Sequence, residues 1–112
     1  MTKTTNDIIN RVAEDLGLKA SDVDLADEDK EKIERRVDSV TAFLREKGLI
    51  WWADDAIPDA CEDGFAMMVA AMVCKAFGKQ NQGHEAGWED GRVMIAQLKP
   101  SENVEQQAYE YY

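Results

Sequence analysis

The sequence predicts an all-α fold, an antiparallel bundle of about four helices with an extended C-terminal tail. Every long periodic segment has apolar residues at helical spacing. The chain has 112 residues, the size of one domain, and no internal repeat or linker separates the helical segments. We therefore expect residues 1–99 to form the bundle and residues 100–112 to form a tail that docks on a partner.

The first predicted helix begins at Thr5 or Asn6, both favoured N-cap residues, and ends before Gly17. Its apolar face consists of Ile8, Ile9, Val12, Ala13 and Leu16. In the loop that follows, Val23 and Leu25 stand among turn-forming residues, so we expect both to pack as apolar anchors.

The second predicted helix is long and amphipathic and runs from Asp27 to Lys47, with Gly48 after its end. Its apolar stripe, at spacings of 3 and 4, consists of Ile33, Val37, Val40, Phe43 and Leu44. The segment GLIWWADDAIP then interrupts the helical pattern, which predicts a loop that contains Trp51 and Trp52.

The third predicted helix spans residues 58–77, with Pro58 in its first turn. It has almost no polar face after Gly64, so it is expected to be the central and most buried element. Its wide apolar face consists of Phe65, Met68, Val69, Met72, Val73, Ala76 and Phe77.

A fourth helix is predicted over residues 84–98 and ends before Pro100. Its expected apolar face consists of Trp88, Ile95 and Leu98. The four helices together predict a core formed by Ile9, Val12, Leu16, Ile33, Val37, Val40, Leu44, Phe65, Val69, Met72, Val73, Ile95 and Leu98.

The charge balance disfavours several classes of partner. Thirteen Lys and Arg residues stand against 23 Asp and Glu, which gives a net charge of −10 and a pI near 4.4. This is the wrong sign for binding nucleic-acid phosphates or an anionic membrane. No apolar run approaches the roughly 18 residues of a membrane span, and the N-terminus lacks a hydrophobic signal core, so we expect a soluble protein made in the cytoplasm.

Nucleophilic and metal-ligating residues are few. We therefore expect that the protein is not an enzyme and has no cofactor or metal site. Cys61 and Cys74 would lie about 20 Å apart on one helix, which excludes a disulfide or a shared metal and predicts reduced core thiols. His84 is the single histidine and is expected in a loop or helix cap. No zinc-ligand pair, catalytic triad or phosphate-binding loop occurs.

The last residues, PSENVEQQAYEYY, have no positive charge and end in a tyrosine cluster. A fraying chain end is one reading of this segment. The three tyrosines favour an interaction segment, because such side chains are enriched where one protein meets another. In an extended strand Tyr109 and Tyr111 would lie on one side, which suits addition to a partner's sheet edge.

The order of these segments resembles the small head-to-tail connector proteins of tailed bacteriophages, also called adaptor or head-completion proteins. The resemblance covers nearly the whole chain. It rests on DIINRVAEDLG, the long helix ending in FLREKGL, the turn WWADDAIPD, the Ala/Met-rich helix ending in FG, the helix ending in IAQLKPS and the terminal EYY.

The resemblance implies an α-helical virion subunit without enzymatic activity, made in the host cytoplasm and located at the head-to-tail interface. Such subunits form a ring, here of about twelve copies, beneath the portal protein. The ring helps to retain packaged DNA, which passes through it without specific binding, and it offers tail or nozzle proteins an attachment platform. A C-terminal extension that docks on the portal would use Val104, Tyr109, Tyr111 and Tyr112 of this chain.

Trp51 and Trp52 allow two interpretations. At least one is expected to close the end of the bundle. An exposed member would be a subunit contact, since tryptophan is a favoured interface anchor. Charged residues also allow two interpretations: the acids of residues 54–63 could pair with bases of a neighbouring copy, or they form a solvated face.

Three other classes of function compete with the connector. A small acidic inhibitor that mimics DNA would carry carboxylates along one whole face, whereas here acids and bases are interleaved over much of the chain. A helical regulator or chaperone would share the composition. A small enzyme or metal-dependent helical protein is the weakest alternative.

Overall fold

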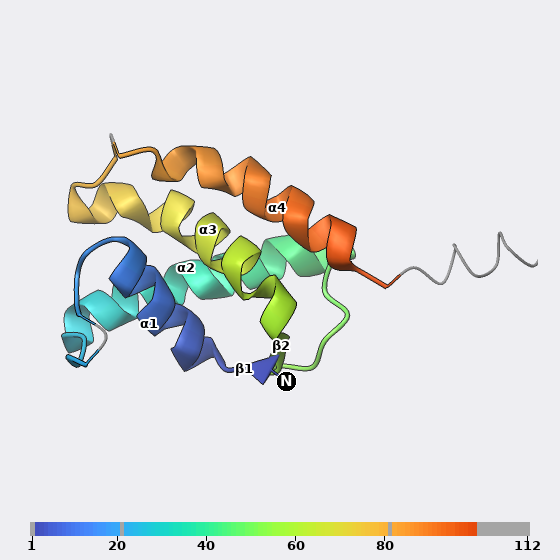
Figure 1. Cartoon of the computed structure of the whole chain (residues 1–112), viewed down its shortest axis with the longest axis horizontal. Helices are drawn as coiled ribbons and strands as arrows, with labels where there is room; N and C mark the ends of the chain where they lie inside the picture. Colours follow the sequence, from blue (N-terminus) through green and yellow to red (C-terminus); the bar gives the residue numbers. More distant parts are fainter. Residues whose placement is uncertain (1, 21, 81, 101–112) are drawn as a thin grey trace, which may run out of the picture.

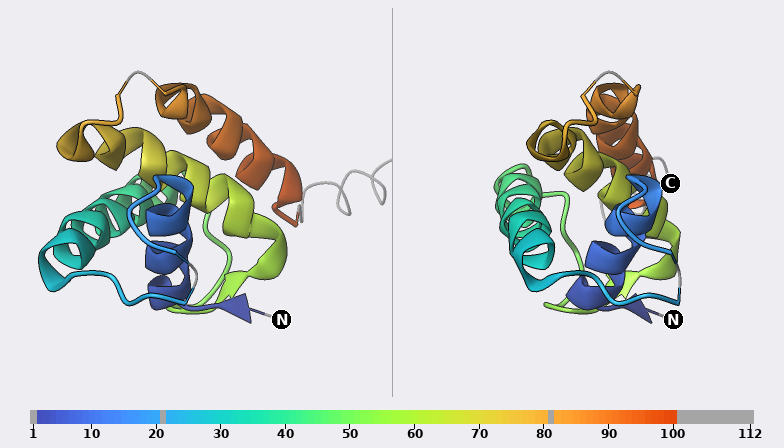
Figure 2. Two further views of the ribbon diagram at one scale, coloured as in Figure 1. Left: turned by 60° about the vertical axis from the view of Figure 1, so that its left-hand side comes forward. Right: turned by 90° about the vertical axis from the view of Figure 1, so that its left-hand side faces the viewer.

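The computed structural model describes residues 2–20, 22–80 and 82–100, and this part of the chain has an all-α fold. The helices are α1 (Thr5–Asp15), α2 (Asp27–Glu46), α3 (Glu62–Val73) and α4 (Gly87–Leu98). Helices α3 and α4 run antiparallel side by side, whereas α1 crosses α2 steeply (Figure 1 and Figure 2). Within these described ranges, no helix is both long and apolar enough to cross a membrane.

The N-cap of the first helix lies one residue before the earlier of the two caps that the sequence suggested. Thr4 is the N-cap: its Oγ1 accepts the N–H of Asp7 at 3.1 Å, and the Asp7 carboxylate accepts the N–H of Thr4 at 2.9 Å. This reciprocal pair satisfies two main-chain donors that the helix leaves free. The helix ends at Asp15, before Gly17, as expected.

The second helix agrees with its predicted bounds to within one residue and buries Ile33, Val37, Val40 and Leu44. Phe43 is only half-buried at the edge of the core. The preceding loop differs from expectation, because Val23 is 53% exposed and is not an anchor. Leu25 alone packs against the core there.

The predicted helix over residues 58–77 is wrong as one continuous element. Ile57–Pro58 form a short strand, β2, that pairs antiparallel with β1 (Thr2–Lys3). Pro58 has φ −56° and ψ 140°, which is an extended conformation. The φ that the proline ring fixes is compatible with both a helix and a strand, and here the residue lies in a strand. Two 3-10 helices flank α3: η1 (Asp59–Cys61) and η2 (Cys74–Phe77).

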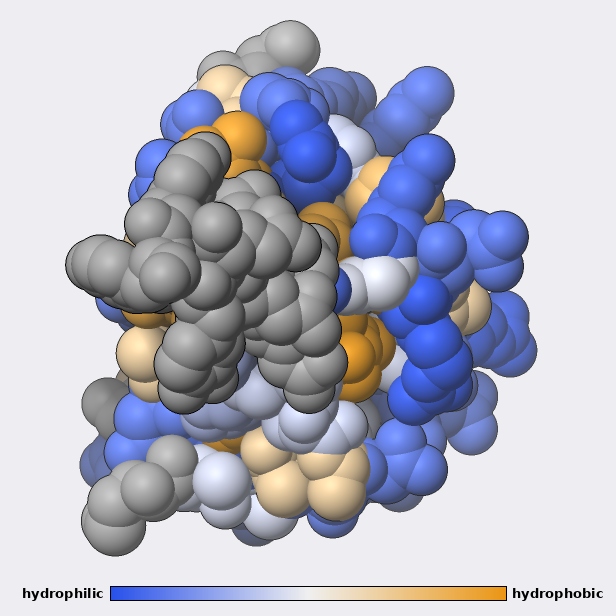
Figure 3. Space-filling view, turned by 90° about the vertical axis from the view of Figure 1, so that its right-hand side faces the viewer, coloured by the Kyte–Doolittle hydropathy of each residue, from blue (hydrophilic) through white to orange (hydrophobic). Residues whose placement is uncertain are grey.

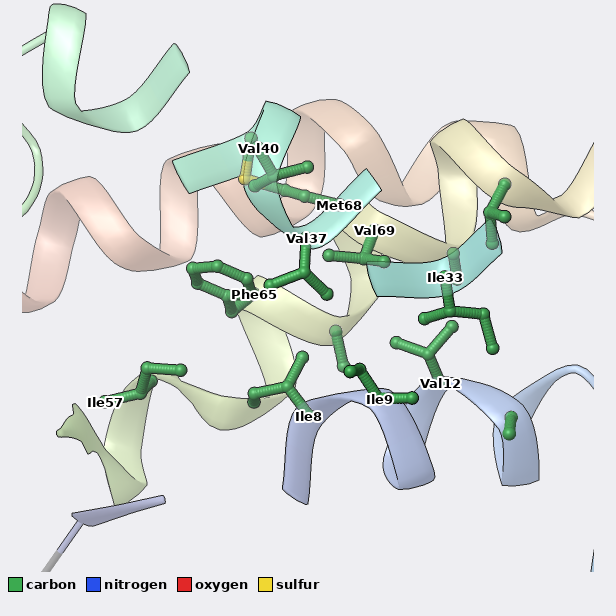
Figure 4. Packing of buried hydrophobic residues seen from close by; sticks show 14 of the residues in the cluster. Ile8, Ile9, Val12, Ile33, Val37, Val40, Ile57, Phe65, Met68 and Val69 are labelled. Carbon is green, nitrogen blue, oxygen red and sulfur yellow. The ribbon is translucent and has the colours of Figure 1, made fainter. Parts of the chain in front are cut away.

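The expectation that the third helix is the central element is confirmed, since α3 contacts α1, α2 and α4. Figure 4 shows side chains of α1, α2 and α3 converging on one core around Val69. Met72 is an exception to the predicted core, because it is only partly buried. The thiols of Cys61 and Cys74 are buried, as expected. Other buried residues outside the predicted core list are Ile8, Ala13, Ile57, Ala66, Met68 and Ala70.

The predicted buried face of the fourth helix is confirmed only at Ile95. A 3-10 helix, η3 (His84–Ala86), precedes α4; Trp88 is half-buried and Leu98 is 42% exposed. The buried residues of α4 are Gly87, Gly91 and Ile95, at helical spacing. Two of these glycines carry no hydrophobic side chain, so the hydropathy pattern does not reveal this face.

Glycine lets α3 and α4 approach main chain to main chain. A Cβ added to Gly91 would lie 2.3 Å from the carbonyl oxygen of Gly64 and 2.8 Å from Cγ of Met68. A Cβ added to Gly64 would lie 2.9 Å from the carbonyl oxygen of Gly91. No larger residue fits at this crossing without separating the helices.

Gly91→Ala tests this contact. Helix propensity alone would make alanine more stable by about 1 kcal/mol. We expect a net loss of about 1–3 kcal/mol in the free energy of unfolding, because the new methyl group overpacks the crossing. Urea denaturation of both proteins measures the difference, and a stabilised variant would contradict the close approach.

Val69→Asp tests the position of the core. Val69 is fully buried, so an unpaired carboxylate there should cost more than about 4 kcal/mol and leave the domain unfolded. Val93→Asp is the matched control on α4, where the side chain is 38% exposed, and should cost less than about 1 kcal/mol. Circular dichroism melting compares them; a Val69→Asp protein that melts like the parent would show that α3 is misplaced.

Candidate functional site

The loop of residues 49–56, here called the Trp loop, lies at the end of the bundle where α2 stops. Gly48 adopts φ +69°, a conformation that glycine tolerates, and ends α2. The N–H of Leu49 then donates to the carbonyl of Leu44 at 2.8 Å. This turn directs the chain across the bundle end toward β2 (Figure 1).

Trp51 and Trp52 are both half-buried against the core. Their rings meet edge to face, with centroids 4.8 Å apart, and Trp52 lies 6.4 Å from the ring of buried Phe65. The pair is thus held by the core while part of its aromatic surface faces solvent. Figure 3 views this end of the molecule and shows hydrophobic side chains at the surface beside hydrophilic ones.

Asp55 fastens the Trp loop to the start of α1. Its φ is +61°, a left-handed conformation that aspartate tolerates better than most residues. Its carboxylate accepts the N–H of Thr5 at 2.5 Å, and this hydrogen bond holds the pKa of Asp55 below its ordinary value. Pairing of β1 with β2 fastens the same two segments a few residues away.

A crevice of about 450 Å³ lies between α2 and the Trp loop. Arg45 on α2 pairs with Asp54 on the loop at 3.2 Å and bridges the two sides. Apolar residues from α2, the loop, β2 and α3 line the crevice: Val37, Ala42, Trp52, Ile57 and Phe65. Its polar lining consists of Thr5, Asp38, Thr41, Arg45, Asp54 and Asp55.

The last described residues leave the bundle at this same end. The Lys99 ammonium donates to the carbonyl of Gly48 at 2.6 Å, which ties the end of α4 to the end of α2. The Trp loop begins directly after Gly48, so the chain enters residues 100–112 beside it. The predicted docking residues Val104, Tyr109, Tyr111 and Tyr112 lie outside the described residues.

The cysteines and the histidine form no reactive centre among the residues that the structure describes. Cys61 and Cys74 are buried and free at opposite ends of α3, as predicted, and burial raises the pKa of each thiol. A raised pKa keeps a thiol protonated and unreactive. His84 is half-buried in η3, and no group of three or more His, Cys, Asp or Glu in the described ranges could hold a metal ion.

Sequence reasoning singled out Trp51 and Trp52 but missed the crevice beside them. The crevice depends on the bond between Asp55 and Thr5, which are 50 residues apart, and no local pattern encodes such a contact. The one available signal was the Asp54–Asp55 pair, since aspartate is enriched at left-handed positions. No family model, curated protein or solved structure matches the chain.

Asp55→Asn tests the bond that shapes the site. Asparagine tolerates the same backbone conformation, so the variant removes mainly the charge. Because the folded pKa is lowered, the carboxylate stabilises the fold above its unfolded pKa of about 3.9, and this contribution disappears as pH falls through the folded pKa. We expect the parent to melt above the variant at pH 7 and the difference to vanish in acid; a constant difference would contradict this bond.

Proposed function

We propose that this protein is a structural virion protein, a head-to-tail adaptor subunit of a tailed bacteriophage. In this proposal the subunits form a ring of about twelve copies beneath the portal protein. The ring helps to retain packaged DNA and gives tail or nozzle proteins an attachment platform. The resemblance in the order of helical segments is the starting point, and the all-α bundle agrees with it.

One observation carries the proposal further: the Lys99–Gly48 hydrogen bond brings the start of the tail segment to the end of the bundle that holds Trp51 and Trp52. An adaptor needs a rigid body for lateral contacts and a separate segment for the portal. The bundle supplies the body, and the tryptophan pair is proposed as part of the subunit interface. Residues 100–112 are proposed as the portal latch.

The charge of the chain suits a protein that lines a path for DNA. A net charge of −10 repels phosphate, so a ring of such subunits would let DNA pass without binding it. The buried thiols and the single histidine of this chain give no support to a catalytic role. The proposal therefore assigns the protein an architectural function.

Truncation after Ser101 tests the latch. The full chain and the truncated chain, each with an N-terminal tag, are produced in cells that also make portal and tail proteins of the same virus. The captured complexes are then weighed by native mass spectrometry. We expect the full chain to yield a cyclic assembly of about twelve copies with the portal. Truncation should abolish that complex without lowering the melting temperature.

Two controls make the result specific. A full-length chain with Tyr109, Tyr111 and Tyr112 replaced by serine separates the aromatic contacts from mere tail length, and it should also lose the portal complex. Capture of a one-to-one complex with a nucleic-acid enzyme, unaffected by truncation, would overturn the adaptor function and favour an acidic inhibitor.

A further inference from the structure

The two flanks of α2 carry opposite charge. The basic flank is defined by Lys32, Arg36 and Lys47 on the side of α2 that meets η2 and α4. Asp29 lies on the same side, seven residues before Arg36, so the flank keeps an excess of two positive charges. The acidic flank is the opposite side, which faces the Trp loop. It is defined by the carboxylates of Glu31, Glu34, Asp38, Asp54 and Asp55.

Aromatic rings lie beside two of the three cations of the basic flank. The Lys32 ammonium lies 5.4 Å from the ring centre of Phe77, and the Lys47 ammonium lies 5.8 Å from that of Phe43. Phe43 in turn packs on Trp88 of α4, with centroids 4.9 Å apart. Arg36 is exposed, and neither it nor the two lysines form an ion pair with any other described residue.

The acidic flank is hollow. Its centre is the crevice of about 450 Å³, whose apolar lining includes the Trp52 and Phe65 side chains. A second hollow of about 310 Å³ continues along α2 and shares Asp38 with the crevice. Among the described residues that line the two hollows, Arg35 and Arg45 are the only cations, and Arg45 is already paired with Asp54.

Helix geometry prevents these flanks from neutralising each other within one chain. Arg36 and Asp38 are two residues apart, which turns their side chains about 200° from one another around the helix axis. In the right-hand view of Figure 2, α2 lies at one edge of the molecule, with α3 and α4 on one side of it. Complementary surfaces that point in opposite directions match in a head-to-tail arrangement of copies.

We propose that the basic flank of one copy docks into the acidic crevice of a second copy, with Arg36 as the cation that faces Asp38. Charge complementarity selects the occupant, because the chain carries an unpaired basic, aromatic surface and an acidic, apolar-lined hollow of its own. The inference rests on the proposed function, since it names the lateral contact that a ring of adaptors requires. The contact is heterologous, so it can repeat from subunit to subunit.

Charge reversal tests the contact on the purified full chain. Sedimentation equilibrium at low salt measures self-association of the parent, Arg36→Glu, Asp38→Lys and the double variant. Both side chains are exposed, so melting temperatures should stay close to that of the parent. Each single reversal should raise the dissociation constant by about tenfold or more, and the double variant should recover most of the loss.

Mixing the two single variants, Arg36→Glu and Asp38→Lys, tests whether these two residues face each other across the contact. Arg36→Glu keeps Asp38 in its crevice, and Asp38→Lys keeps Arg36 on its basic flank, so these two copies can join through the native pair. The opposite contact between them sets the introduced glutamate against the introduced lysine, the same swapped pair as in the double variant. The mixture should therefore recover longer assemblies in which the two variants alternate, while each variant alone stays largely monomeric. Lys75→Glu and Asp90→Lys are exposed controls outside both flanks and should associate like the parent.

Several results would overturn the proposal. A parent that stays monomeric, or one that associates equally well with either reversal, has no such contact. The parent could also stay monomeric while Arg36→Glu changes only how well residues 102–112 are protected from proteolysis. That result would show that the basic flank binds the acidic C-terminal residues of its own chain instead of a second copy. The failure of this contact can be told apart from the failure of the proposed function. If both charge-reversal variants still form normal rings with the portal, the contact between flanks is refuted and the adaptor function stands. If the parent associates in a charge-dependent way but never binds the portal, the adaptor function is refuted and the contact stands.

Discussion

The contact between Gly64 and Gly91 is the constraint on which the rest of the structure depends. It brings α4 against α3 at main-chain distance, because neither residue has a side chain to hold the helices apart. With α4 seated there, α3 is enclosed by three helices and its apolar face is buried. The same placement ends α4 beside α2, where Lys99 reaches the carbonyl of Gly48.

That arrangement concentrates the candidate interaction features around α2. Its end carries the Trp loop and the start of the tail segment, and its two sides carry opposite charge around an acidic crevice. An amphipathic helix such as α2 needs no charge asymmetry to fold, since burial of its apolar stripe supplies most of the stability. The asymmetry is therefore more informative about association than about folding, and an adaptor ring is a function that would use it.

Sequence patterns predicted those parts of the fold that hydropathy encodes. The α2 bounds and its stripe from Ile33 to Leu44 follow from helical spacing, and the burial of α3 follows from its lack of polar residues. The pattern failed where tertiary contacts decide. Pro58 is extended because β2 pairs with the N-terminus, and the face of α4 was misassigned because glycine carries no hydropathy signal. The Trp pair was predictable, but the crevice beside it depends on the distant Asp55–Thr5 bond.

A nuclear Overhauser measurement on the isotopically labelled full chain tests the contact between Gly64 and Gly91 most directly. The close crossing predicts strong cross-peaks between the α-protons of Gly91 and both the α-protons of Gly64 and the side chain of Met68. The cross-peak between the α-protons of the two glycines requires main-chain contact and would not arise from ordinary side-chain packing between two helices. Their absence, in a spectrum where α3 and α4 are otherwise assigned as helices, would contradict the glycine crossing and the position of α4 that follows from it.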